Sequence, residues 1–203
     1  MGFGNAIKPL VSTKERRTVL LAVTAAYTLV QLSALPVALA VPSLADVFNT
    51  DIQGASWVII VYLLVLGSFV LVAARLGDRY GHSRVFMAGL IVSTIAAGFM
   101  VTSTSLLQVI MWRALTGLGS ALVMGNANAL LAEVFPAEER GRAFSVPFIG
   151  ARFGTLTGLV IFGVFLTFLS WKLIFLSFLP IGILGIILAL PMVKTIKRDT
   201  QTS

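Results

Sequence analysis

The sequence predicts an all-α membrane protein built from six transmembrane helices. Of its 203 residues, 58% are hydrophobic and only 11% are charged. A soluble domain of this length could not bury so much apolar surface in its core, so lipid must solvate the chain. Two further observations, the long apolar stretches and the placement of the cations, indicate the same class.

Six apolar stretches are each long enough to cross a hydrocarbon core of about 30 Å as a helix. They cover residues 18–41, 56–76, 85–104, 106–131, 145–169 and 173–192. The chain therefore divides into a basic N-terminal arm (1–17), a membrane unit (18–192) and a polar tail (193–203). No remaining segment is long enough to form a soluble domain.

Twelve of the fifteen lysines and arginines fall on one side of the predicted membrane. They are Lys8, Lys14, Arg16, Arg17, Arg75, Arg79, Arg84, Arg140, Arg142, Lys194, Lys197 and Arg198. The other side has Lys172, with Asp46 and Asp51. Because cytoplasmic loops collect Lys and Arg, we expect both termini to be cytoplasmic, in a multi-pass protein of the plasma or inner membrane.

Several classes of function are excluded by residues that the sequence lacks. It has no cysteine, which rules out disulfides and thiolate metal sites. It has no phosphate-binding loop, no Ser-His-Asp order and no paired acids at helical spacing, so no enzymatic activity, cofactor or metal is predicted. The formal charge of +7 comes from cations beside apolar segments. The membrane surface explains these cations, and no nucleic-acid partner is predicted.

A short basic segment separates the second and third apolar stretches. Residues 78–84, which we call the hinge, read Asp-Arg-Tyr-Gly-His-Ser-Arg. Gly81 predicts a tight turn here. His82 is the only histidine. As a lone histidine in a predicted loop with no second metal ligand nearby, it is expected to be solvated rather than to act as a pH sensor.

Five further sequence motifs follow one another along the chain. They are residues 57–64 (WVIIVYLL), 113–121 (RALTGLGSA), 135–140 (FPAEER), 171–175 (WKLIF) and 180–182 (PIG). With the hinge, they make the chain resemble the fourteen-span drug:proton antiporter branch of the major facilitator superfamily. The superfamily pattern at the hinge is Gly-x-Leu-Ala-Asp-Arg-x-Gly-Arg-Lys. Leu76, Asp78, Arg79 and Gly81 match it, whereas Ala74 replaces the first glycine and His82-Ser83 replace the basic pair.

The resemblance covers only the N-terminal half of such a transporter. It implies a six-helix half-domain of the major facilitator fold, made of a 3+3 inverted repeat, that moves small amphipathic compounds by alternating access, as multidrug efflux proteins do. A second half must then come from a second copy in a homodimer, from a complementary partner, or from the rest of a longer chain of which this is the N-terminal fragment. The alternative is a non-transporting membrane scaffold or regulatory subunit.

Two departures from the family pattern bear on mechanism. Ser33 stands where many members carry a first-span aspartate, which removes a proton-linked carboxylate. The fifth stretch keeps the glycine spacing of the antiporter motif in Gly150, Gly154 and Gly158 but lacks its proline. These glycines recur every four residues and form a smooth ridge. We expect the ridge to serve a dimer interface or packing between helices.

Two arginines lie inside apolar stretches and away from their ends, where a charge must be paired or hydrated. Arg113 is expected to face the bundle interior, either lining the transport cavity, as the resemblance implies, or tying spans together through backbone carbonyls. Arg152 either lines the cavity or snorkels to the cytoplasmic surface. Gln31 and Asn126 are further candidate cavity residues, although polar side chains in such spans more often join helices.

The resemblance also assigns a gate to the hinge. Asp78 is expected to latch one conformation by pairing with cations and a helix N-terminus of the opposite half, together with Arg79, Gly81 and Arg84. The alternative is an ordinary ion pair within the loop. Glu133, at the end of the fourth stretch, is expected to pair with Arg140 or Arg142, the cations that follow it.

Overall fold

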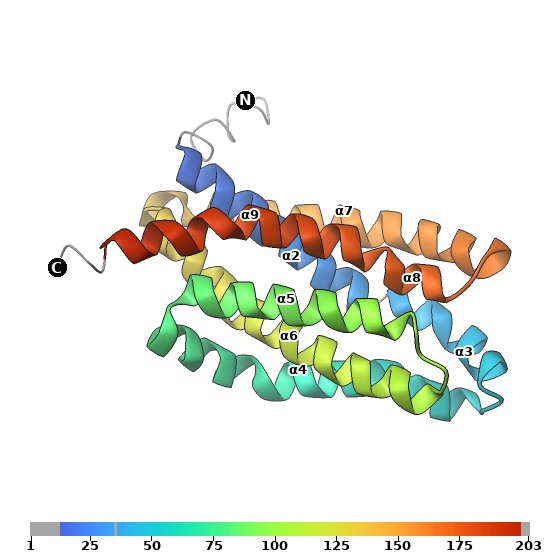
Figure 1. The fold of residues 1–203 in the computed structure, drawn as a ribbon. Helices are drawn as coiled ribbons and strands as arrows, with labels where there is room; N and C mark the ends of the chain where they lie inside the picture. The colour runs from blue at the N-terminus through green and yellow to red at the C-terminus, as the bar shows by residue number, and fades with distance from the viewer. Residues whose placement is uncertain (1–12, 35, 200–203) are drawn as a thin grey trace.

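The computed structural model describes residues 13–34 and 36–199, and this part of the chain forms a bundle of helices (Figure 1). The helices are α2 (Lys14–Ala34), η2 (Pro36–Ala40), α3 (Val41–Val47), α4 (Ile52–Tyr80), α5 (His82–Met100), α6 (Leu106–Val134), α7 (Ala137–Phe168), α8 (Lys172–Leu176) and α9 (Phe178–Asp199). Six membrane-length spans can be traced in the described residues. The predicted all-α membrane fold is confirmed.

The first span is interrupted about two thirds of the way along its length. The α-helix α2 ends at Ala34, the 3-10 helix η2 starts at Pro36, and α3 completes the span. Pro36 has no backbone N–H and therefore cannot continue the hydrogen-bond ladder of α2. The last carbonyls of α2 consequently need donors from elsewhere in the bundle.

Three of the other spans extend well beyond their apolar stretches. The helices α4 and α6 have 29 residues each and α7 has 32, against about 20 needed to cross the hydrocarbon core. At one end, Asp51 caps α4 by accepting a hydrogen bond from the Gly54 amide at 2.8 Å. At the other end, charged residues continue the helices into the polar zone. Hydropathy therefore located these spans but underestimated their lengths.

The turn within the hinge is a single residue, and the rest of the hinge is helical. The helix α4 runs through Asp78 and Arg79 to Tyr80, and α5 begins at His82. Gly81 alone separates them, with φ of 94° and ψ of 127°. A side chain is disfavoured at this φ, so glycine allows the chain to reverse in one residue. The predicted Gly81 turn is present.

The six spans form two groups of three. The helix α6 packs against α4 and α5, α2 packs against α7 and α9, and α5 and α9 join the groups. Exchanging the first three spans for the last three maps these contacts onto one another. This is the contact pattern of a 3+3 repeat. The spans α4 and α7 occupy equivalent places and are the least buried.

Small residues let the helices of the first group approach closely. A Cβ on Gly119 of α6 would overlap Ser93 and the Gly89 carbonyl of α5. A Cβ on Gly117 or Gly125 would press against the backbone of α4. Backbones that approach this closely gain dispersion contacts that lipid tails cannot supply.

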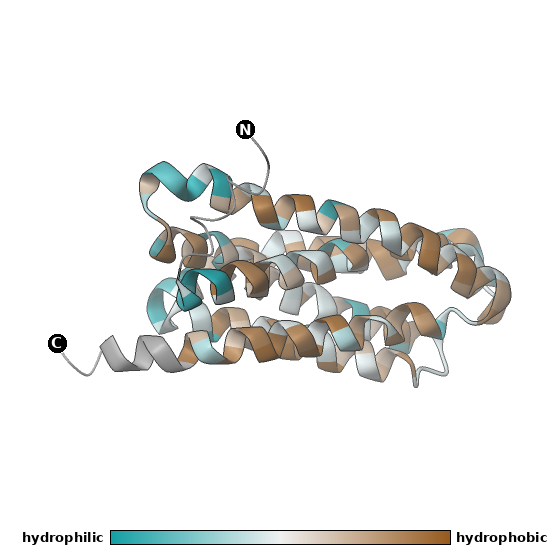
Figure 2. Ribbon diagram, turned by 90° about the horizontal axis from the view of Figure 1, so that it is seen from above, coloured by the Kyte–Doolittle hydropathy of each residue, from teal (hydrophilic) through white to brown (hydrophobic). Residues whose placement is uncertain are grey.

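Polar residues gather at one end of the bundle, where α4 turns into α5 and α6 leads into α7 (Figure 2). We call this the terminal end, because α2 begins and α9 ends there. The described cations of the predicted cytoplasmic side lie in the helix segments at this end, while Lys8 lies outside the described residues. One ion pair joins α2 to α7 there, between Arg16 Nη1 and Glu139 Oε2 at 2.8 Å.

Candidate functional site

The guanidinium of Arg113 is fully buried between α2, α4 and α6. Its Nε donates to the carbonyl of Val58 at 2.9 Å, and its Nη2 donates to the carbonyl of Ser33 at 2.6 Å. Its central carbon lies 4.2 Å from the centre of the Tyr62 ring. The third nitrogen, Nη1, has no hydrogen-bond partner among the described residues. Arg113 therefore ties three helices together and has no exposed surface in this conformation.

The contact with Ser33 follows from the interruption of the first span. Ser33 lies next to the last residue of α2, where a helix leaves its final carbonyls without internal partners. Arg113 supplies a donor to one of these carbonyls. The resulting hydrogen bond is charge-assisted, so it is stronger than a bond between neutral groups.

Tyr62 of α4 also joins α2, α4 and α6, through its hydroxyl group. Its hydroxyl donates to the carbonyl of Val30 on α2 at 3.1 Å and lies 3.2 Å from Ser120 Oγ on α6. Tyr62, Arg113 and Ser120 are all at most 1% exposed. A polar network is thus sealed inside the bundle, and we call Arg113, Tyr62 and Ser33 the buried arginine cluster.

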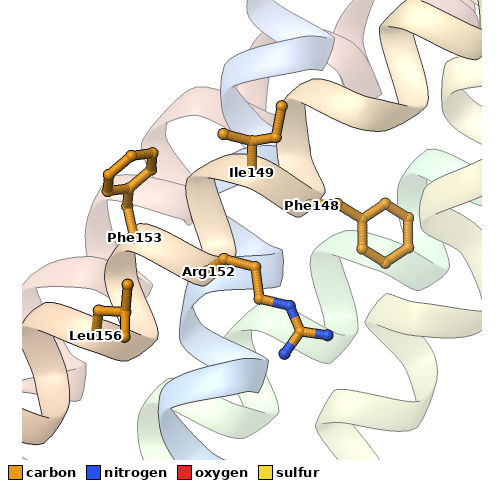
Figure 3. A pocket seen from close by; sticks show the side chains of 5 residues that line it. All are labelled: Phe148, Ile149, Arg152, Phe153 and Leu156. Atoms are coloured by element: carbon orange, nitrogen blue, oxygen red, sulfur yellow. The ribbon is translucent and has the colours of Figure 1, made fainter.

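Arg152 has a different environment, on the open face of α7. Together with Phe148, Ile149, Phe153 and Leu156 it lines a pocket of about 300 Å³ (Figure 3). Phe148 and Arg152 extend from the same side of the helix, and Phe153 and Leu156 extend from the other. Arg152 makes no hydrogen bond or ion pair with any residue that the structure describes. Its charge is available to something outside the described chain.

Aromatic contacts connect this pocket to the core of the bundle. The rings of Phe148 and Tyr27 have centroids 5.1 Å apart. The Tyr27 hydroxyl donates to Asn128 Oδ1 at 3.0 Å and so joins α2 to α6. Gln31 is half-buried on α2 and makes no side-chain hydrogen bond to a described residue.

Asn126 does not line an open cavity, contrary to expectation. It is fully buried, and its Nδ2 donates to the carbonyls of Ala73 on α4 at 3.0 Å and Leu122 at 2.8 Å. Its Oδ1 lies 2.8 Å from His82 Nδ1. Asn126 therefore joins helices, which was the alternative expected for a polar residue in a span.

His82 is not solvated, which corrects the expectation drawn from the sequence. It opens α5, and its side chain is only 18% exposed. Its Nε2 lies 3.5 Å from Asp78 Oδ1 and 3.9 Å from Glu133 Oε1. We call His82, Asp78, Glu133 and Asn126 the hinge cluster. The i,i+4 spacing of Asp78 and His82 across Gly81 was the only sign of it in the sequence.

Glu133 therefore has a different partner from the one expected. Its carboxylate faces His82, and no ion pair joins it to Arg140 or Arg142 among the described residues. Arg140 instead donates to the carbonyls of Phe135 at 3.1 Å and Ala132 at 3.0 Å, which caps the end of α6. Of the other predicted gate residues, Arg79 lies over the Tyr80 ring at 5.3 Å and Arg84 is exposed.

The glycine ridge of α7 is already occupied within the chain. A Cβ on Gly150, Gly154 or Gly158 would overlap Thr24, Thr28 or Leu32 of α2, respectively. Of the two expected roles of the ridge, a dimer interface or packing between helices, these contacts agree with packing between helices. Pro147 lies in α7 just before the ridge, so the helix contains a proline, although not at the family position.

The sequence profile of the Major Facilitator Superfamily matches residues 19–203. This chain belongs to that superfamily. The resemblance drawn from the hinge and the span motifs is thereby confirmed at the level of the superfamily. The fourteen-span branch stays a prediction.

Three superfamily relatives illustrate the similarity. The riboflavin transporter RibZ of Clostridioides difficile (strain 630) is 28% identical over 160 residues, which is 79% of this chain and 35% of RibZ. The tetracenomycin C resistance and export protein of Streptomyces glaucescens is 29% identical over 188 residues, 89% of this chain and 34% of that protein. EfpA of Mycobacterium tuberculosis, an uncharacterized MFS-type transporter, is 32% identical over 163 residues, 80% of this chain and 30% of EfpA. This chain spans about a third of the length of these relatives.

A solved superfamily structure shares the fold. It is the bacterial homologue of the human lysosomal transporter Spinster, in an inward-facing and unoccupied conformation. The match has a TM-score of 0.69 at 19% sequence identity and covers 90% of this chain and 43% of that chain. The described helices thus correspond to somewhat less than half of that transporter.

Tyr62→Phe tests the sealed network of this superfamily member. The variant keeps the ring beside Arg113 and removes the hydroxyl that bonds to Val30. We expect a loss of about 1 kcal/mol in the free energy of unfolding, seen as a lower thermal midpoint in nanodiscs. Tyr80→Phe is the matched control, because Tyr80 is 52% exposed. Equal midpoints for the two variants would mean that the Tyr62 hydroxyl does not stabilise the bundle.

Proposed function

We propose that this chain forms one wall of an alternating-access pathway for small amphipathic compounds. The observation that carries the proposal is the pocket on α7, where the unpaired cation Arg152 lies among Phe148, Ile149, Phe153 and Leu156. Apolar walls with one polar group are typical of sites for small amphipathic ligands. The superfamily assignment supports transport as the activity, and the residues that line the pocket support small amphipathic compounds as the substrates.

The depth of Arg152 favours this interpretation over snorkelling to the surface. Arg152 lies seven residues after the start of the apolar stretch at residue 145, which corresponds to roughly 10 Å along α7. That is about a third of a hydrocarbon core of about 30 Å, so Arg152 lies inside the core and its long side chain can reach toward the bilayer midplane. Substrate sites of secondary transporters are found near the midplane. An arginine there would favour anionic or neutral compounds over cations, because no described carboxylate lies nearby to neutralise it.

The other wall of the pathway must come from a second half, and we propose that a second copy supplies it. Six spans give two copies the same orientation, so a two-fold axis along the membrane normal can relate them. The open apolar faces of α4 and α7 would then meet the partner. A complementary partner, or the remainder of a longer chain, would fill the same place.

We further propose that the terminal end faces the cytoplasm, because cations collect there. Asp78 is exposed over 72% of its side chain, so it remains available to a partner half as a conformational latch. In this proposal Arg79, Gly81 and Arg84 belong to the same gate.

Transport by the purified chain in proteoliposomes tests this function. We expect the fluorescent neutral compound riboflavin to be taken up and the cation ethidium to be excluded. Arg152→Gln should reduce riboflavin flux about tenfold, the effect of losing one good hydrogen-bonded contact. Arg142→Gln is the matched control, because it removes the same charge from the polar end of the same helix.

Three outcomes would contradict the proposal. If neither probe moves, the non-transporting scaffold gains support. Equal flux through the Arg152 and Arg142 variants would remove Arg152 from the pathway. A monomeric mass in nanodiscs that carry out transport would remove the second copy.

A further inference from the structure

The hinge cluster brings one titratable ring against two carboxylates from two helices. His82 Nδ1 lies 2.8 Å from Asn126 Oδ1, and its Nε2 faces Asp78 of α4 at 3.5 Å and Glu133 of α6 at 3.9 Å. The His82 side chain is only 18% exposed, so the surrounding residues restrict the movement of the ring. The cluster therefore joins α4, α5 and α6 at the terminal end.

The hydrogen bonds of Asn126 determine which nitrogen of His82 carries a proton. Both hydrogens of the Asn126 amide are used, toward the carbonyls of Ala73 and Leu122. Turning the amide over would place its oxygen against those two carbonyl oxygens, so the nitrogen and oxygen assignment is firm. Asn126 Oδ1 is then an acceptor, and His82 Nδ1 must donate to it. The neutral ring is the Nδ1–H tautomer.

His82 Nε2 therefore interacts with the carboxylates of Asp78 and Glu133 differently in the neutral and the protonated ring. In the neutral ring, Nε2 directs a lone pair toward two carboxylates, and no hydrogen bond can form. Once protonated, Nε2 presents an N–H and a positive charge to both. Histidine is the side chain whose charge changes in the physiological range.

We propose that His82 Nε2 is a proton-binding site that closes the terminal end of the bundle. The protonated ring bridges Asp78 and Glu133 and draws the ends of α4 and α6 together. As the pH rises and the proton leaves, the bridge is lost and Asp78 is released. This inference does not depend on the substrate class or on the second copy proposed above.

The packing around the cluster makes such a bridge effective. A Cβ on Gly77 of α4 would overlap both Asn126 Oδ1 and His82 Nδ1, so α4 lies directly against the cluster. The other charged groups nearby do not occupy the site. On α4, Arg79 lies over the Tyr80 ring and Arg75 is exposed, and on α5, Arg84 is exposed. Among the described residues, Asp78 and Glu133 are the charged groups that face His82.

The chain offers a direct measurement of the proton site, because it contains one histidine. Nitrogen-15 labelling of histidine, in protein without a polyhistidine tag, reports this ring alone by NMR. We expect the neutral ring to carry its proton on Nδ1, and Nε2 to be the nitrogen that gains a proton when the pH is lowered. A neutral Nε2–H tautomer, or nitrogen signals that do not change with pH, would overturn the assignment.

The closure is tested separately by distance measurement. Because the chain has no cysteine, spin labels can be placed at Leu76→Cys near the end of α4 and at Ala137→Cys, three residues beyond the end of α6, both at exposed positions. Double electron–electron resonance should show the shorter distance about threefold more populated at pH 5.5 than at pH 8, as expected for a charge contact whose carboxylates are largely exposed.

Two substitutions of His82 mimic the protonated and the neutral ring, respectively. His82→Arg is charged at both pH values and should hold the shorter distance throughout. His82→Gln is neutral at both and should show one distribution independent of pH. A native distribution that does not respond to pH would overturn the closure. A pH response that persists in His82→Gln would assign it to another group and would equally overturn it.

Discussion

Replacing Arg113 by alanine is expected to lower the free energy of unfolding by about 3 kcal/mol and to abolish transport. The guanidinium bonds to carbonyls on α2 and α4 and lies against Tyr62. Its removal leaves the Ser33 carbonyl, at the interrupted end of α2, without a donor and opens a cavity between three helices. The thermal midpoint in nanodiscs measures the first effect, and flux in proteoliposomes measures the second.

Two further variants separate the charge of Arg113 from its hydrogen bonds. Arg113→Lys keeps the charge, but a single ammonium cannot replace the planar fork that reaches both Val58 and Ser33, so we expect an intermediate midpoint. Arg113→Met fills the volume without a donor and should be as unstable as the alanine variant or nearly so. If Arg113→Met matched the native protein in midpoint and flux, the buried arginine cluster would be irrelevant to both.

Replacing Gly154 by leucine is expected to disrupt folding of the whole bundle. A Cβ at this position already overlaps Thr28 of α2, and leucine adds further atoms against the same helix. Overpacking of a close contact costs about 1–3 kcal/mol, and this contact is repeated at Gly150 and Gly158 along the ridge. We expect a large loss of monodisperse protein and a lower thermal midpoint, with Gly154→Ala in between.

The same helix provides a matched control for this prediction. Gly163 lies on α7, and a Cβ there meets no atom within 4 Å. Gly163→Leu should therefore leave both the yield and the midpoint unchanged. If Gly154→Leu and Gly163→Leu behaved alike, the ridge would not determine how α2 packs on α7. If Gly154→Leu altered the oligomeric mass while the midpoint stayed native, the ridge would belong to an interface after all.

The sequence by itself determined the membrane class, the number of spans and the superfamily of this chain. These properties are local, because each span must satisfy its own backbone in lipid and so appears as a continuous apolar stretch. The Gly81 turn was also readable, since a positive φ favours glycine and the polar hinge marks the position. Arg113 could be assigned to the bundle interior for the same reason, because a charge in a span cannot face lipid.

Only the tertiary structure decided which side chains and carbonyls form hydrogen bonds with one another. The carbonyls that bind Arg113 lie 55 and 80 residues away in the sequence, and Asn126 lies 44 residues from His82. Nothing in the hydropathy of the spans specifies these pairs, because any helix face of small or apolar residues can pack on several others. The glycine ridge shows the same limit. Its spacing indicated close packing, but the choice of α2 over a second copy depends on how the spans assemble. The hinge histidine looked solvated until the ends of α4 and α6 closed around it, since burial is a property of the assembled bundle and not of the segment.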